Sequence, residues 1–266
     1  MKKMLCVMVF LVLAAQLPLW SYDQSPSDRQ ILPEAVWAAA AGGGTWVTEV
    51  QITCFSSAAA DINVYFYYNG GYTGSFLIET GLAQFHSTRF DNILSTIDEK
   101  DVGGTIYYGK VGAIWFYSSN SSQKIMVQAR TVNGNYGKTF PGLGVVDANS
   151  AVVNRDMVIQ DIVQDSNYRT NVGVFNSSTT IYTVSFLILK ADGSSVGNFS
   201  LTLAPSEFRS FNPFALAGHA QSSFSGCWLF IHPTAGDSTA PGVFCYGSIA
   251  NNYTNDTYAL IARMYL

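Results

Sequence analysis

The stretch Trp46-Val47-Thr48-Glu49-Val50-Gln51-Ile52 returns in altered form as Tyr168-Arg169-Thr170-Asn171-Val172-Gly173-Val174, about 122 positions further along the chain. Within the first copy, apolar and polar residues alternate, which is the pattern of a half-buried β-strand. The similarity continues in the same order at the paired positions Ser56/Ser177, Val64/Val184, Phe66/Phe186, Asn69/Asp192, Leu82/Leu203 and Phe90/Phe211. Self-similarity over this length indicates that a structural unit has been duplicated.

Turn signals stand at equivalent places in the two copies. Asn69-Gly70-Gly71 follows one alternating run, and Asp192-Gly193 follows its counterpart, and both are typical of β-hairpins. Each copy holds seven or so short alternating runs, and only 91–101 and 213–219 are expected as helical turns. We therefore predict an all-β protein of two tandem immunoglobulin-like antiparallel β-sandwich domains.

The N-terminus has the pattern of a signal peptide. Met1-Lys2-Lys3 is basic, the run 4–20 is almost entirely apolar, and small Ser21 precedes a polar stretch. The predicted organisation is a signal peptide over 1–21, a polar tether over 22–31, domain 1 over 32–145 and domain 2 over 146–266. We expect a secreted, periplasmic or cell-surface protein with no membrane span after cleavage.

The charge balance excludes some partners. Removal of Lys2 and Lys3 with the signal peptide leaves 12 basic residues against 18 acidic ones, a net charge of −6. No cluster of Lys and Arg remains that would hold a phosphate backbone, so nucleic acid is not an expected partner. No motif in the chain points to a cofactor, and none is expected.

Three runs carry a resemblance to a known group. They are Tyr136-Gly137-Lys138-Thr139-Phe140-Pro141-Gly142-Leu143-Gly144, the segment 165–176 with its core Arg169-Thr170-Asn171-Val172-Gly173-Val174-Phe175-Asn176, and Tyr246-Gly247-Ser248-Ile249-Ala250-Asn251-Asn252. With these runs the chain resembles secreted bacterial tandem β-sandwich (immunoglobulin-like) proteins. The resemblance implies the architecture and an exported location, and it brings no catalytic residue. The first copy departs from the pattern, because Val47-Thr48-Glu49 stands where the second has Arg169-Thr170-Asn171.

A strip of tyrosines is the candidate ligand site. Tyr65 and Tyr67 alternate with apolar residues and should face outward, and Tyr68 and Tyr72 flank the predicted turn. Tyrosines on an open sheet face stack on sugar rings or anchor a protein partner. The alternative is that the neighbouring domain covers this face, or that the rings are simply strand formers.

Several further residues are expected to have structural roles. Arg169 is predicted to form an ion pair with Asp165 or Asp161 at the start of a strand, next to Asn171. Cys227 and Cys245 lie on successive predicted strands, so a disulfide between them and two separate thiols are both open. Cys54 shares the buried face of its strand and is expected as a small core residue.

Catalysis is not expected. The run Gly193-Ser194-Ser195-Val196-Gly197 matches G-x-S-x-G but lies in a hairpin, whereas a nucleophile elbow needs a strand that leads into a helix. The three histidines have no metal-ligand spacing. We predict a non-catalytic exported structural or interaction protein that acts through sandwich faces and edges and self-associates at the cell surface. The alternative is a carbohydrate-binding module, and a glycosidase or protease is the third class.

Overall fold

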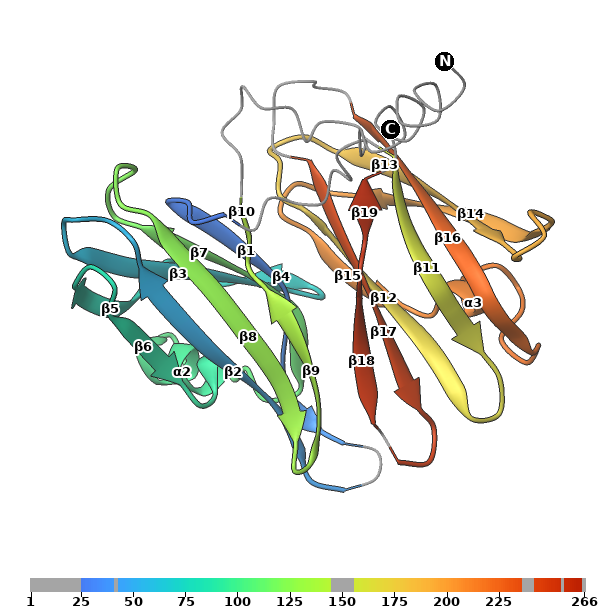
Figure 1. The fold of residues 1–266 in the computed structure, drawn as a ribbon, viewed down its shortest axis with the longest axis horizontal. Coiled ribbons are helices and arrows are strands. Elements are labelled where there is room, and N and C mark those ends of the chain that lie inside the picture. Colours follow the sequence, from blue (N-terminus) through green and yellow to red (C-terminus); the bar gives the residue numbers. More distant parts are fainter. Residues whose placement is uncertain (1–24, 41–42, 145–155, 236–241, 255, 265–266) are drawn as a thin grey trace, which may run out of the picture.

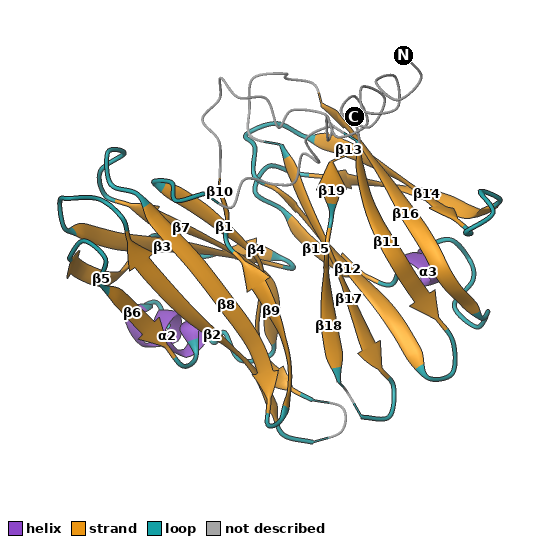
Figure 2. Cartoon of the chain, in the orientation of Figure 1, coloured by secondary structure: helices purple, strands orange, loops and turns teal. Residues whose placement is uncertain are grey.

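The computed structural model describes residues 25–40, 43–144, 156–235, 242–254 and 256–264. The predicted signal peptide and the predicted domain boundary at 145/146 lie outside these residues. The described chain is almost entirely β-strand, with two short helices (Figure 2). None of these helices has the length and apolar character needed to cross a bilayer.

The described part of the first unit contains ten strands and one helix (Figure 1). Its elements are β1 (Arg29–Ala39), β2 (Thr45–Cys54), β3 (Ala60–Tyr68), β4 (Gly71–Tyr72), β5 (Phe76–Leu82), β6 (Ser87–Phe90), α2 (Ile93–Lys100), β7 (Lys110–Ser118), β8 (Ile125–Asn133), β9 (Tyr136–Pro141) and β10 (Leu143–Gly144). β1 begins at Arg29, within the segment that the sequence pattern assigned to the tether.

Within its described residues, the second unit contains nine strands and one helix. They are β11 (Met157–Gln164), β12 (Tyr168–Asn176), β13 (Tyr182–Leu189), β14 (Ser195–Leu203), β15 (Phe208–Phe211), α3 (Pro213–Leu216), β16 (Phe224–Ala235), β17 (Val243–Asn251), β18 (Thr257–Ile261) and β19 (Arg263–Met264). Both helices begin after an asparagine N-cap, Asn92 and Asn212, whose side chain accepts a backbone N–H of the first turn.

The two units have the same strand order, and all pairings are antiparallel. In the first, one layer runs β5-β3-β7-β1-β10, with β4 also paired to β3, and the other runs β6-β2-β8-β9. In the second, the layers are β14-β13-β16-β11-β19 and β15-β12-β17-β18. The layers of a unit join at one corner, β1 with β2 or β11 with β12, and in the first unit an isolated bridge between Ser27 and Ile125 joins them a second time. The all-β tandem architecture is therefore confirmed.

The threonine that recurs in the two copies of the motif, Thr48 or Thr170, has the same structural role in both units. β1 and β11 each bulge, and just after the bulge the buried hydroxyl of Thr48 or Thr170 accepts the backbone N–H of Val36 or Val163, at 2.8 and 2.9 Å. A bulge leaves backbone groups unpaired, and a buried hydroxyl that satisfies one of them stabilises the corner. This explains why the threonine recurs.

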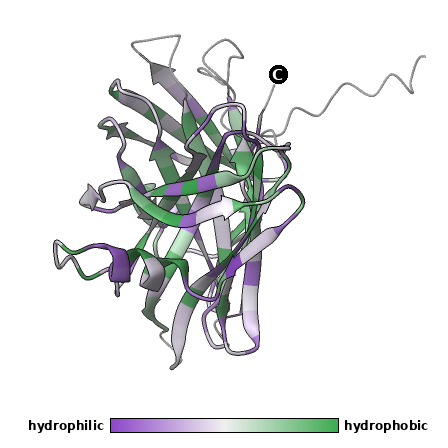
Figure 3. Ribbon diagram, turned by 90° about the vertical axis from the view of Figure 1, so that its left-hand side faces the viewer, coloured by the Kyte–Doolittle hydropathy of each residue, from purple (hydrophilic) through white to green (hydrophobic). Residues whose placement is uncertain are grey.

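Alternating apolar side chains fill the space between the layers, with hydrophobic segments concentrated along the strands (Figure 3). The two predicted hairpin turns are present, with Gly70 at φ +92° and Gly193 at φ +81°. One core extends through both units, because the outer face of the β3-β7-β1 layer packs against the outer face of the β15-β12-β17 layer. We call this contact the junction.

Candidate functional site

The tyrosine strip lies at the junction. Tyr65 and Tyr67 point away from the first core, as predicted, since Val64 and Phe66 are fully buried beneath them. Tyr67 is nevertheless only 7% exposed, because Phe175 of the second unit packs on its ring with centroids 4.8 Å apart. The prediction of an exposed Tyr67 is wrong, and the alternative of a face covered by the neighbouring unit holds.

The other tyrosines of the strip do not form a platform either. Tyr65 is half-buried and stacks on Tyr117 at 5.5 Å. Tyr68 is half-buried against Tyr107 and lies under the ammonium of Lys110. Tyr72 alone is well exposed, at 66%, and it leans on Tyr67 with ring centroids 6.0 Å apart. A sugar ring at this surface could therefore stack on one exposed tyrosine and not on a strip of them.

The strands that carry the repeated motif, β2 and β12, have different side chains on their outer faces. In β2 it carries Glu49, which forms ion pairs with Arg130 at 3.2 Å and Arg89 at 3.4 Å. In β12 the equivalent position is Asn171, which lies opposite Ser248. The face of the first unit is in water, and that of the second is buried in the junction. Burial of unpaired charge is costly, which accounts for the loss of the ion pairs in the second copy.

A buried ion pair holds the polar end of the junction. Lys138 of β9 contacts the Glu34 carboxylate at 2.7 Å and donates to the hydroxyl of Ser248 at 2.6 Å. The side chains of Glu34 and Lys138 are only 6% and 7% exposed. The Tyr246 hydroxyl completes the cluster by bonding to Glu34 and Ser210, and burial together with the Glu34 charge holds the pKa of Tyr246 well above its ordinary value.

Sequence reasoning missed this cluster. Glu34 and Lys138 are 104 positions apart, and no motif links them. The signal that was present is a lone acid, Glu34, in the part of β1 after Gln30, which is otherwise apolar. A carboxylate at such a position needs a partner, but the sequence does not name it.

A pocket of about 160 Å³ opens beside the ion pair, between the units. Its wall from the first unit includes Trp46 and Lys138, and its wall from the second includes Arg169, Asn171 and Thr257. The Thr257 side chain is buried, and its hydroxyl has no hydrogen-bond partner among the described residues. Arg169 and Asn171, which the sequence assigned structural roles, thus meet at one cavity.

The predicted partner of Arg169 is different in the structure. Its guanidinium Nη1 donates to Asn252 Oδ1 at 2.8 Å, and among the described residues it forms no ion pair. Asp165 instead accepts the backbone N–H groups of Asn167 and Tyr168, both at 2.7 Å. A short acid that can bond the turn following it is already satisfied, so the predicted Asp165–Arg169 pair is wrong.

Cys227 and Cys245 are not bridged. Cys227 is on β16 and Cys245 on β17, which lie in opposite layers of the second unit and do not pair. No disulfide joins them, and the disulfide alternative is wrong. Cys54 is fully buried in the first core, as predicted. Burial raises the pKa values of the Cys227 and Cys245 thiols.

A serine, a histidine and an aspartate share the outer face of the β13-β16-β11 layer. His232 Nδ1 and Asp156 Oδ1 are 2.5 Å apart, and Ser185 is the cross-strand neighbour of His232. The Ser185 hydroxyl, however, pairs with Ser200 Oγ at 3.1 Å. The side chains of His232 and Asp156 are 60% and 37% exposed on an open sheet. Catalytic groups act best where water is excluded, and this surface does not exclude it.

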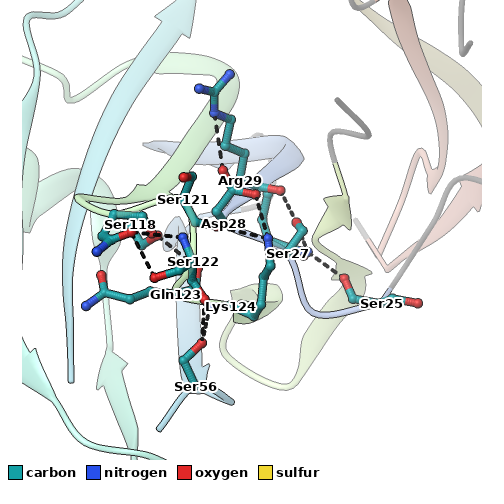
Figure 4. A network of polar contacts seen from close by, with 12 residues as sticks. Ser25, Ser27, Asp28, Arg29, Ser56, Ser118, Ser121, Ser122, Gln123 and Lys124 are labelled. Carbon is teal, nitrogen blue, oxygen red and sulfur yellow. Dashed lines mark hydrogen bonds and ion pairs between the residues drawn. The ribbon is translucent and has the colours of Figure 1, made fainter. Parts of the chain in front are cut away.

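A polar network fastens the start of β1 (Figure 4). Lys124 Nζ bonds to Asp28 Oδ1 at 3.1 Å, and its backbone N–H bonds to Ser56. Ser27 forms an isolated bridge with Ile125, and Ser118 closes the turn by donating to the carbonyl of Gln123 at 3.0 Å. These contacts hold the first strand to the β7–β8 turn, so the network is structural.

Comparison with known proteins adds little on function. No family model matches the sequence, and no curated protein matches it. Among solved structures, Thermotoga maritima 1070 is 11% identical with a TM-score of 0.32, covering 43% of this chain and 95% of its own. A Pleurotus ostreatus lectin in its apo form is 12% identical with a TM-score of 0.22, covering 93% of this chain and 78% of its own. Likenesses this low carry no functional argument.

Proposed function

We propose that this chain is a non-catalytic, exported interaction protein, and that two copies associate by antiparallel pairing of their β14 edge strands. One observation carries the proposal. β14 is an edge strand of nine residues, Ser195–Leu203, without a charged residue or a proline. A long uncharged edge presents unpaired backbone N–H and C=O groups that another strand can satisfy.

The other described edges are protected in recognised ways. β4, β10 and β19 have two residues each, and β6 and β15 have four residues each, with Arg89 and Arg209 among them. β9 contains Lys138 and Pro141, and β18 lies against β9 at the junction. Short length, charge, proline and coverage are the devices that keep edges from pairing.

The comparison with β5, the counterpart of β14, is the most direct. β5 contains Glu79, pairs with β3 through register shifts, and has Gly81 at φ +66°. Irregular pairing and a charge both oppose addition of another strand. β14 instead pairs residue for residue with β13 from Gly197 to Leu203. Of the two equivalent edge strands, β5 is therefore protected against further pairing and β14 is not.

Only part of β14 is open. At its start, His219 Nε2 lies 2.9 Å from the Val196 carbonyl oxygen, and the loop after α3 approaches Gly197 closely. The open part is 198–203, where Phe199 and Leu201 are half-buried on the inner face. A neighbouring strand would cover the exposed parts of these two side chains, which adds apolar burial to the new backbone bonds.

A second copy is the partner that fits this edge. Antiparallel pairing of a strand with itself creates a two-fold axis, and each side chain then meets an equivalent segment. Because 198–203 holds no charge, no like charges face one another in such a pair. The proposed export rests on the basic and apolar N-terminal pattern, which would deliver the chain to a place where it assembles outside the cytoplasm.

The test uses the exported chain, residues 22–266, and a variant with Ser200→Lys and Thr202→Lys. Both residues are exposed, so the fold should be retained. We expect concentration-dependent dimers of the wild type in light scattering, and at least about tenfold weaker association of the variant, since lysines would face lysines across the axis. Thr139→Lys, on the edge strand β9, is the control and should associate like the wild type.

Two outcomes would contradict the proposal. One is a wild type that stays monomeric at every concentration tested. The other is a double-lysine variant that associates as tightly as the wild type and the control. Circular dichroism of all three proteins would show that each is folded.

A further inference from the structure

The junction pocket has the properties of a ligand site, and this conclusion is independent of how β14 pairs. Its volume of about 160 Å³ far exceeds the roughly 10–15 Å³ that one ordered water needs. Contacts between domains are common places for small-molecule sites, because two surfaces supply walls that neither has alone. Here the pocket lies where the two units meet, at the end of the junction that holds the Glu34–Lys138 ion pair. The Tyr67–Phe175 contact lies at the other end.

An unsatisfied hydroxyl lies in the pocket wall. Thr257 is 8% exposed, and its Oγ1 atom is buried without a hydrogen-bond partner among the described residues. Buried polar atoms are rarely left unpaired, because the hydrogen bonds they had with water are lost. In this rotamer Oγ1 is enclosed, with less than 1 Å² of accessible surface, and rotation about χ1 would turn it toward a hydroxyl or carbonyl group inside the pocket. Thr257 therefore indicates a ligand that forms hydrogen bonds.

The pocket has a cation available for an acidic group. Lys138 is already paired with Glu34, so these two charges offset each other. Arg169 lines the pocket, uses one N–H on the uncharged Asn252, and forms no ion pair within the described part of the chain. A guanidinium has five N–H donors, and it prefers a carboxylate that can accept two of them.

The remaining walls combine an aromatic surface with an amide. Trp46 is half-buried on the first-unit side, and Asn171 lies on the second-unit side. An indole contacts the C–H face of a sugar-like molecule, and an amide both donates to and accepts from hydroxyl groups. Apolar Val36 and Ala250 limit the space next to them. The walls suit a compact molecule with several hydroxyl groups.

We propose that the junction pocket binds a small polyhydroxylated carboxylate, of the class of a single sugar acid. Arg169 would hold the carboxylate, Thr257 and Asn171 would bond the hydroxyl groups, and Trp46 would cover the C–H face. Because the ligand would contact both units, its binding would also stabilise the junction.

The experiment measures binding of four probes to the exported chain by calorimetry: D-glucuronate, D-gluconate, D-glucose and acetate. We expect binding of at least one of the two sugar acids, and at least about tenfold weaker binding of glucose and of acetate. Arg169→Met should weaken sugar-acid binding at least about tenfold, and Thr257→Val about fivefold. Arg130→Met is the control, because it removes a cation of the exposed first-unit face, outside the pocket.

The variants keep the test decisive. Thr257→Val removes a hydroxyl that has no described partner and preserves the side-chain shape, so it should fold even if Arg169→Met does not. The proposal is overturned if neither sugar acid binds, if glucose binds as tightly as they do, or if Thr257→Val binds like the wild type. Ser200→Lys with Thr202→Lys should leave binding unchanged, which separates this site from the β14 edge.

Discussion

The ring of Tyr246 on β17 occupies the space that a side chain at Gly173 on β12 would need. A Cβ atom built at Gly173 would lie 1.9 Å from Cε1 of the ring, and 2.6 Å from its hydroxyl. The same ring packs edge-on against Phe140 of the first unit, with centroids 5.3 Å apart. Glycine at this position therefore lets Tyr246 lie flat enough on its own sheet to reach across the junction.

Gly173→Ala should destabilise the protein by about 1–3 kcal/mol, because the added methyl group must displace a ring that is fixed by Phe140 and Glu34. Urea denaturation measures the change in the free energy of unfolding. Gln51→Ala, at the equivalent exposed position of the first unit, is the control and should change it by less than about 0.5 kcal/mol. Equal effects of the two substitutions would contradict the role assigned to Gly173.

Lys138→Met should cost about 3–5 kcal/mol, because it leaves the Glu34 carboxylate buried without its cation. Adding Glu34→Gln to Lys138→Met should recover part of this loss, since the unpaired charge is then removed as well. A double-mutant cycle by urea denaturation measures the coupling between the two residues. Additive effects would show that the two side chains do not stabilise each other.

Stability should fall as the pH rises above about 10. Burial is the main cause that raises the pKa values of Tyr67 and Tyr246 above the ordinary 10.0. Below that pH both the folded and the unfolded chain keep these protons, so neither tyrosine makes stability depend on pH. Above it the unfolded chain loses them first, which favours unfolding by up to about 1.4 kcal/mol per pH unit for each tyrosine.

The tyrosine contribution is measured from urea midpoints between pH 8 and about 11.5. Tyr67→Phe should make the decline shallower, and Tyr72→Phe, at a well-exposed tyrosine of the same strip, serves as the control. A decline that is identical in the wild type and in Tyr67→Phe would rule out Tyr67 as a source of the pH dependence.

The cysteines of the exported chain should stay reduced and unreactive while the protein is folded. Cys54, Cys227 and Cys245 are buried, and burial raises the pKa values of the latter two, so little thiolate forms at neutral pH. We expect Ellman's reagent to label the protein only after unfolding. Mass spectrometry after mild oxidation of the native protein should find no Cys227–Cys245 disulfide, and finding one would contradict the two separate, protected thiols of the structure.

Local pattern accounts for the elements that the sequence predicted correctly. The alternation in 46–54 and 168–176 gave two strands, and Asn69-Gly70 and Asp192-Gly193 gave the hairpin turns. Residues 105–108 form no strand, because Tyr107 is held in a loop by bonds to Asp98 and Asp101. Side chains that satisfy the backbone of a loop compete with strand pairing, and alternation does not reveal them.

The candidate sites were harder to predict than the strands. The tyrosine strip was recognised as a distinctive face, but its covering by Phe175 depends on a residue more than a hundred positions away. The Glu34–Lys138 pair, the orphan hydroxyl of Thr257 and the open edge of β14 have no sequence motif. Each depends on which strands lie side by side.

The sequence by itself determined that this protein is built twice from one β-sandwich, because strand periodicity and turn chemistry are local properties that survive duplication. Only the tertiary structure decided how the two copies differ in use. Glu49 and Asn171 occupy equivalent positions, yet one faces water among arginines and the other lines a pocket between the units. That difference arises because two like sandwiches joined face to face bury one surface of each, and burial is a property of long-range packing.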